Sequence, residues 1–298
     1  MKVYKGQFDD AALDVNIKGM ENERMAYPLA YGYCLVGRIV QCGSNVSKET
    51  YLGQLAFTFA AHATHVVTSV DGIQLVPPDI SAQDAIFMPS VETALSLVHD
   101  AQVRVGENVA VFGQGLIGLL VTAILRMNHN PSTYSGNYGI ITTFDALPDR
   151  LAASSQMGST QALLPGGFRG PFDVTIEVSG NSRALQSAID RTADGGKVVI
   201  GSWYGNADVS LKLGMEFHRS HKTIITSQVS ELPASVSGLW DKRRRFGLAW
   251  DLVRDIRPSR LLTRMVALKN AKEAYQALDK GSDLAIAFDH RREEGHGP

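Results

Sequence analysis

The middle of the chain alternates between short, continuously apolar runs and amphipathic segments. Strands that are buried on both faces of a parallel sheet read as continuous apolar runs, and the helices between them cover those faces. The apolar runs lie at 108–112, 139–144, 173–178 and 197–200, and helical periodicity follows at 116–127, 150–157 and 182–191. The pattern predicts an α/β fold with a doubly wound parallel sheet over residues 81–255.

The first 80 residues have a different texture. Short apolar runs at 31–40, 54–59 and 65–69 are separated by polar and glycine-containing breaks, which favour a small antiparallel β unit. Two prolines make residues 75–80 extended, and a helix is predicted from Ser81 to Asp100.

The end of the chain, over residues 256–298, leaves the strand–helix alternation again. We expect a strand at 261–267, an amphipathic helix at 271–278 and a final strand at 284–288, with residues 290–298 polar and frayed.

Composition excludes several classes of function. Of 298 residues, 29 are Lys or Arg and 30 are Asp or Glu, so the protein has no strong field to attract nucleic acid. No apolar run approaches the ~20 residues of a membrane span, so no membrane partner is expected. Cys34 and Cys42 would lie about 26 Å apart on one strand, too far for a disulfide. Reduced thiols, with no signal peptide behind Met1, predict a cytoplasmic protein, with targeting to an organelle as the alternative if residues before Met1 are missing.

A glycine pattern lies where the strand at 108–112 passes into the next helix. Gly113, Gly115 and Gly118 have the Gly-x-Gly-x-x-Gly spacing, and their place between strand and helix is what a dinucleotide site requires. The first glycine permits the turn, the second admits a pyrophosphate, and the third lets helix and strand pack closely. The backbone N–H groups of Leu116 and Ile117 would face the phosphates.

Asp145 ends the next predicted strand and is placed to bind the adenosine ribose hydroxyls. It lies further from Gly118 than is usual, which a looped insertion at 128–137 explains. Its carboxylate would repel a 2′-phosphate, so we expect NAD as the cofactor. Arg150 could accommodate that phosphate, so NADP is not excluded.

The stretch 95–118, the closing segment 267–288 and the pattern Pro28-x-x-x-Gly32-x-x-x-x-Gly37 together resemble the medium-chain dehydrogenase/reductase family of zinc-type alcohol dehydrogenase-like proteins. The resemblance implies a GroES-like, β-rich catalytic domain built from both chain ends around a central Rossmann domain. It also implies a homodimer or homotetramer.

The chain departs from this family at the zinc ligands. Gly32-Tyr33-Cys34 stands where zinc members have Gly-His-Glu, and Met88-Pro89 falls near the later ligand position. The family's first ligand would lie before Met1, so the chain resembles an N-terminally shortened member. A catalytic zinc needs about three protein ligands, so we expect no metal site and no zinc.

Four residues are candidates for the chemistry. Tyr33 takes the place of a metal ligand, where its phenol could donate a proton, although a core tyrosine is an equal alternative. His62 and His65 are on opposite faces of a predicted strand, so they are a poor metal pair. One of them could face the substrate, although a structural role is favoured for either histidine alone. Glu92, if buried, could act as an acid or base, or it could pair structurally.

The resemblance adds several cofactor contacts. Thr93, with Glu92, aligns with the helix start that borders nicotinamide, Gly201 and Ser202 with the carboxamide site, and Ser179 with the ribose site. The basic run at 242–245 is either a solvated helix face or a site for a phosphate- or carboxylate-bearing substrate.

These observations predict an NAD(P)-dependent oxidoreductase that transfers hydride between nicotinamide and a small-molecule alcohol, ketone or activated alkene without zinc. The alternative is a catalytically inactive dinucleotide-binding sensor or interaction protein of the same fold.

Overall fold

The computed structural model describes residues 31–128, 137–167, 170–233 and 236–290, and the chain divides into two compact units. Unit 1 combines Met1–Pro89 with Gly247–Pro298, and unit 2 is Ser90–Phe246. The sequence placed its boundaries near 80 and 255, whereas this division falls inside α3 (Met88–Ala101) and α8 (Lys242–Ile256).

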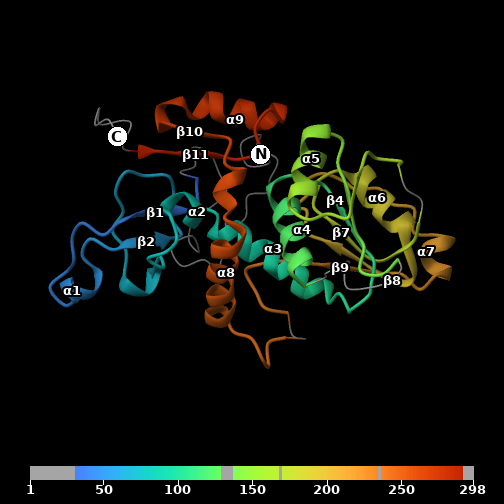
Figure 1. The fold of residues 1–298 in the computed structure, drawn as a ribbon, viewed down its shortest axis with the longest axis horizontal. Helices are drawn as coiled ribbons and strands as arrows, with labels where there is room; N and C mark the ends of the chain where they lie inside the picture. Colours follow the sequence, from blue (N-terminus) through green and yellow to red (C-terminus); the bar gives the residue numbers. More distant parts are fainter. Residues whose placement is uncertain (1–30, 129–136, 168–169, 234–235, 291–298) are drawn as a thin grey trace. The chain divides into compact units, whose positions relative to one another are not determined.

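Unit 2 contains a sheet of parallel strands in the order β6-β5-β4-β7-β8-β9. Its strands β4, β7, β8 and β9 are labelled in Figure 1. The neighbours of β4 are β5 on one side and β7 on the other. The chain builds the sheet outward from β4 through β5 and β6, and then returns to build it in the opposite direction from β7, so the strand order reverses beside β4. Phe112 is level with Phe144 and Glu177, which brings the carboxyl ends of three strands to one edge. The strands are β4 (Val109–Phe112), β5 (Ile141–Phe144), β6 (Gln161–Leu163), β7 (Phe172–Glu177), β8 (Thr192–Ile200) and β9 (Thr223–Thr226).

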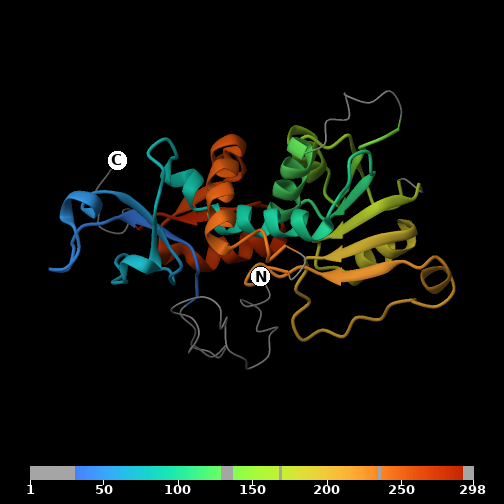
Figure 2. The same cartoon turned by 90° about the horizontal axis from the view of Figure 1, so that it is seen from below.

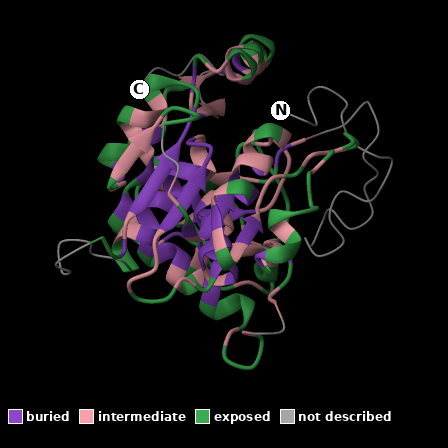
Figure 3. Ribbon diagram, turned by 90° about the vertical axis from the view of Figure 1, so that its right-hand side faces the viewer, coloured by how far each residue is buried: buried purple, intermediate pink, exposed green. Residues whose placement is uncertain are grey.

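Helices cover both faces of this sheet, whose strands lie side by side in Figure 2. Ala110 and Phe112 pack in a buried cluster with Leu185 and Ile189 of α6, while the alternate residues of β4 face the opposite side. The strands β4, β5 and β7 are largely buried, as their apolar runs predict, and buried strands lie at the centre of the sheet in Figure 3. The other helices wholly within the unit are α4 (Leu116–Asn128), α5 (Pro148–Gln156) and α7 (Glu216–Arg219), and α6 spans Ser182–Arg191.

Unit 1 is a smaller, β-containing assembly. An antiparallel sheet has the order β1-β2-β3, and a separate parallel pair joins β10 to β11. Phe57 of β2 packs edge-on against Trp250, whose indole N–H donates to Gln74 of β3. The elements are β1 (Leu35–Arg38), α1 (Lys48–Tyr51), β2 (Leu55–Thr58), η1 (Val70–Gly72), β3 (Ile73–Leu75), α2 (Ala82–Ala85), η3 (Pro258–Leu261), β10 (Arg264–Val266), η4 (Leu268–Asn270), α9 (Ala271–Lys280) and β11 (Ile286–Phe288).

Two sequence expectations for residues 65–100 were wrong. Residues 65–69 form no strand; they are exposed, with Val67 fully so, and β3 at 73–75 is the segment that pairs with β2. The β-branched residues at 65–69 favour extended backbone, but a strand also needs a pairing partner. The helix expected from Ser81 to Asp100 is two helices, and α3 restarts just before Pro89, whose missing N–H is tolerated only in a first turn.

Both cysteines are free thiols. They do not share a strand, because β1 starts after Cys34 and ends before Cys42. Within the described residues, no helix has the length and apolarity that crossing a bilayer would take. Most of the expected frayed tail and of the 128–137 loop lies outside those residues.

A buried ion pair joins α3 to the start of α8 within unit 2. The Arg245 guanidinium contacts Glu92 Oε1 through Nη2 at 2.6 Å and Nε at 2.8 Å, and both side chains are at most 5% exposed. Arg245 also donates to the carbonyl oxygens of Val229 and Glu231 in the loop that follows β9. One guanidinium therefore holds together two helices and a loop.

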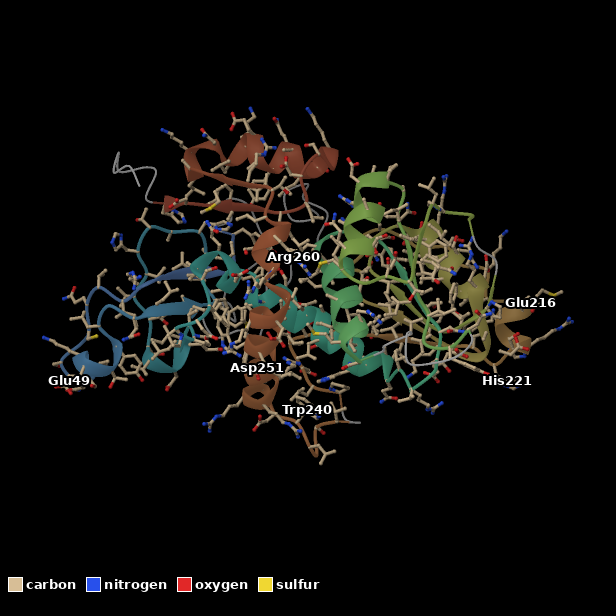
Figure 4. The ribbon with its side chains drawn as sticks, viewed as in Figure 1. Glu49, Glu216, His221, Trp240, Asp251 and Arg260 are labelled. Carbon is tan, nitrogen blue, oxygen red and sulfur yellow. The ribbon has the colours of Figure 1, made fainter. Side chains whose placement is uncertain are left out.

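We predict that Glu92→Gln lowers the free energy of unfolding by about 3–5 kcal/mol, because it leaves a buried guanidinium without its counter-ion. Denaturant unfolding measures this change. Glu216→Gln on α7, exposed at the edge of unit 2 (Figure 4), is the control and should behave as wild type. Equal stability of the two variants would contradict the structural role of the pair.

Candidate functional site

The loop between β4 and α4 is shaped by close backbone packing at its first and last glycines. Gly113 has φ +98°, and a Cβ atom there would lie 2.7 Å from the backbone of Ser179. A Cβ atom on Gly118 would lie 1.8 Å from the Gly113 carbonyl oxygen. Neither position accepts a side chain, because backbone occupies the space.

Gly115, the middle glycine, has the opposite environment. A Cβ atom there would meet only Nη1 of Arg150, at 3.9 Å, so the backbone of Gly115 faces open space beside a guanidinium. Leu116 and Ile117 are partly exposed in the first turn of α4, where backbone N–H groups have no acceptor inside the helix. The five residues that the glycine pattern singled out therefore form one cradle with an open side.

The buried side chain of Gln114 stabilises this cradle. The sequence pattern did not identify this residue. Its side chain is fully buried; Nε2 donates to the Gly113 carbonyl at 3.0 Å, and Oε1 accepts from the Thr122 hydroxyl of α4 at 3.1 Å. The residue type at the x position of a glycine motif carries no signal of burial, so only the packed structure identifies it.

Asp145 lies directly against the cradle. Its Oδ2 accepts a hydrogen bond from the Gln114 backbone N–H at 2.7 Å, and its Oδ1 accepts from the Leu147 N–H at 2.9 Å. Arg150 Nη1 is 3.9 Å from Oδ2. A carboxylate and a guanidinium thus flank the open glycine, in the arrangement expected from the order of these residues along the chain.

A second buried carboxylate, Glu177, ends β7 and was not among the sequence candidates. The Oε1 atom of Glu177 accepts hydrogen bonds from the Ser179 N–H at 2.7 Å and from the Ser179 hydroxyl at 2.5 Å. Its Oε2 atom accepts a hydrogen bond from the Tyr204 hydroxyl at 2.6 Å. Burial, together with the nearby Glu177, raises the pKa of Tyr204. The sequence signal that could have identified Glu177 is a charged residue inside an otherwise apolar strand.

The loop after β8 is attached to the same group of residues. The Gly180 N–H donates to Ser202 Oγ at 2.8 Å, and a Cβ atom on Gly201 would lie 2.5 Å from Leu97 of α3. Ser179, Gly201 and Ser202 are therefore brought together at one edge of the sheet of unit 2.

Two further candidates lie on α3. Glu92 is held by Arg245; burial raises the pKa of its carboxyl, and Arg245 opposes that shift. Thr93 is partly buried beside it. In the basic run at 242–245, Arg245 is the buried partner of Glu92, and Arg244 stacks over Trp240 with its guanidinium carbon 4.1 Å from the ring centre (Trp240 in Figure 4).

In unit 1, the segment at 31–34 lies against His62. The His62 N–H donates to the Tyr31 carbonyl at 3.3 Å, and a Cβ atom on Gly32 would lie 2.8 Å from the His62 backbone. Tyr33, partly exposed, packs edge-on with Tyr31. The structure therefore brings Tyr33 and His62 into one region, although neither belongs to a strand.

The surroundings of His62 include aromatic and titratable groups from the end of the chain. Its ring stacks edge-on with Phe288, 4.9 Å between centres. Burial and the nearby His290 lower the pKa of His62, so its imidazole favours the neutral form. His290 was not a sequence candidate, because it follows the last strand at the far end of the chain.

Cys34 is the potential metal ligand nearest to these residues in sequence. Its thiol donates to the Ile86 carbonyl at 2.9 Å, and burial raises the pKa of the thiol to about 12. Across the described part of the chain, no group of three or more His, Cys, Asp or Glu side chains is arranged to hold a metal ion.

No protein-family model matches the sequence. A curated relative, D-guloside 3-dehydrogenase of Escherichia coli (strain K12), is 25% identical over 271 residues, which cover 86% of this chain and 75% of the relative. The chain is therefore similar to a dehydrogenase over most of its length.

Solved structures share the fold. A putative zinc-binding dehydrogenase from Clostridium scindens superposes with a TM-score of 0.71 at 19% identity, covering 93% of this chain and 84% of its own. A putative zinc-binding dehydrogenase from Sinorhizobium meliloti, solved bound to NADP, gives a TM-score of 0.67 at 17% identity, covering 91% and 82%. Taken with the glycine cradle and the strand order, these similarities show that the chain resembles the zinc-type alcohol dehydrogenase-like proteins of the medium-chain dehydrogenase/reductase family.

Proposed function

We propose that the protein is an NAD(P)-dependent oxidoreductase that transfers hydride between nicotinamide and a small-molecule alcohol or ketone without a catalytic zinc. The observation that carries the proposal is the open backbone at Gly115, between two glycines whose positions are closed by packing. A loop that served only to turn the chain would not need the middle position free.

The residues around Gly115 fit a dinucleotide. The N–H groups of Leu116 and Ile117, at the positive end of α4, suit a diphosphate, and Arg150 adds a positive charge beside them. Asp145 retains acceptor capacity for ribose hydroxyls, since each of its oxygens accepts one backbone N–H. Nicotinamide, when bound, supplies the site that accepts or donates the hydride.

The same residues favour NAD over NADP. Asp145 lies against the cradle through a backbone hydrogen bond, and a fixed carboxylate repels a 2′-phosphate. Arg150, 3.9 Å from that carboxylate, offsets part of the repulsion, so the preference is one of degree.

Proton transfer falls to unit 1 in this proposal. Tyr33 is a phenol in the position of a zinc ligand, and His62 beside it favours the neutral imidazole that can accept a proton. Glu92 is a weaker candidate for acid–base chemistry than for structure, because Arg245 engages its carboxylate.

An alcohol is favoured over an activated alkene as the substrate. The curated relative that aligns with 86% of this chain is named a dehydrogenase of a guloside. Oxidation of an alcohol removes a hydride and a proton, which matches a cofactor cradle together with a separate proton acceptor.

We predict that Gly115→Ala weakens NADH binding at least tenfold while the protein stays folded, because a methyl group there fills open space. Gly118→Ala should lower thermal stability instead, since its Cβ would lie 1.8 Å from the Gly113 carbonyl oxygen. Titration by cofactor fluorescence and thermal unfolding separate the two effects. NADH binding by Gly115→Ala at wild-type strength would contradict the proposed cradle.

Tyr33→Phe should reduce kcat about 10²–10⁴-fold, the range for loss of a general acid or base, with the NADH dissociation constant unchanged. Tyr31→Phe, on the neighbouring aromatic ring, is the matched control. Cofactor turnover against a panel of alcohols and ketones measures both. Silence of the wild type across the panel, with tight NADH binding, would favour the inactive dinucleotide-binding alternative.

Treatment with a chelator followed by dialysis should leave wild-type turnover unchanged, because a catalytic zinc needs about three protein ligands and the described residues contain no such group of His, Cys, Asp or Glu side chains. Elemental analysis of the purified protein should find no stoichiometric zinc. One zinc per chain, with activity lost on its removal, would overturn the zinc-independent mechanism.

A further inference from the structure

Glu177 is a fully buried carboxylate whose partners belong to two different loops. Its Oε1 receives the N–H and the hydroxyl of Ser179, and its Oε2 receives the hydroxyl of Tyr204, all within 2.7 Å. Burying a carboxylate costs several kcal/mol unless hydrogen bonds compensate it. A charge in this position therefore serves to fix the geometry of those two loops.

The loops are those that follow β7 and β8, at the carboxyl edge of the parallel sheet. A second connection joins them where the Gly180 N–H donates to Ser202 Oγ at 2.8 Å. The raised pKa of Tyr204 keeps its hydroxyl protonated, so it remains a donor to Glu177. The two turns are thus held in one arrangement through side-chain hydrogen bonds.

This network abuts the glycine cradle. The backbone of Ser179 occupies the space where a Cβ of Gly113 would lie, 2.7 Å away. Asp145 contacts the cradle by a separate hydrogen bond, to the Gln114 N–H. A dinucleotide spanning this edge would therefore meet two separately stabilised regions, the cradle with Asp145 and the pair of loops fixed by Glu177.

We propose that Glu177 and Tyr204 are positioning residues that hold the loops after β7 and β8 in place for the nicotinamide half of the cofactor. This inference rests on the proposed function. In this proposal, residues Gly113–Gly118 and Asp145 bind the adenosine diphosphate half of the cofactor. Loss of the network should therefore lower the affinity only for ligands that carry the nicotinamide ring.

The test compares two ligands, NADH and ADP-ribose, which lacks the nicotinamide ring. Tyr204→Phe deletes only the hydroxyl that donates to Glu177. We expect its NADH dissociation constant to rise about tenfold, the loss for one hydrogen bond to a charged group, with ADP-ribose affinity within about twofold of wild type. Isothermal titration calorimetry measures both ligands without any need for turnover.

Tyr138→Phe, an exposed tyrosine of unit 2, is the matched control and should bind both ligands as wild type does. Ser202→Ala removes the acceptor of the Gly180 N–H and is a second, smaller variant, which should show the same selective loss of NADH affinity. It keeps the test decisive if Tyr204→Phe fails to fold.

Equal weakening of NADH and ADP-ribose in the folded variants would overturn the proposal, because it would indicate a general structural role. Unchanged affinity for both ligands would overturn it as well. Wild-type protein that binds neither ligand would overturn the proposed function itself. This result differs from the two above, in which the wild type binds both ligands and only the variants decide.

Discussion

The arrangement of unit 2 depends on a backbone-to-backbone contact that only glycine permits. Gly113 lies against the backbone of Ser179, and Gly118 lies against the Gly113 carbonyl oxygen. Any side chain at either position would separate α4 from β4 or β4 from the turn after β7. These contacts occur beside β4, where the strand order reverses, which is the place where open α/β sheets bind their ligands.

Buried carboxylates then fix what surrounds this contact. Asp145 accepts the Gln114 N–H of the cradle, Glu177 collects the donors of two neighbouring loops, and Glu92 pairs with Arg245. In each case at least one donor to the buried charge comes from a segment distant in sequence. Such groups are costly to leave unpaired, so each of them specifies one arrangement of its loops or helices.

Unit 1 supplies a different chemistry. Its candidate region consists of phenols and imidazoles around Tyr31, Tyr33 and His62, with Phe288 from the end of the chain packed on the histidine. The thiol of Cys34 is bonded to a carbonyl and resists ionisation. The proposed mechanism relies on Tyr33 and His62 for proton transfer.

The sequence alone determined the central strands of unit 2 and the glycine positions of the cradle, because both depend on local information. Continuous apolar runs identified the central strands, and the glycine spacing identified Gly113, Gly115 and Gly118. Glycine is recognisable in a sequence because only a residue without a Cβ atom permits such close backbone contacts. Tertiary structure alone decided which segment paired with β2, since residues 65–69 and 73–75 have similar strand propensity. It also decided the pairing of Glu92 with Arg245, 153 positions apart, and of Glu177 with Tyr204. Burial of a charge is settled by the partners that folding brings to it, and a pattern along the chain does not contain that information.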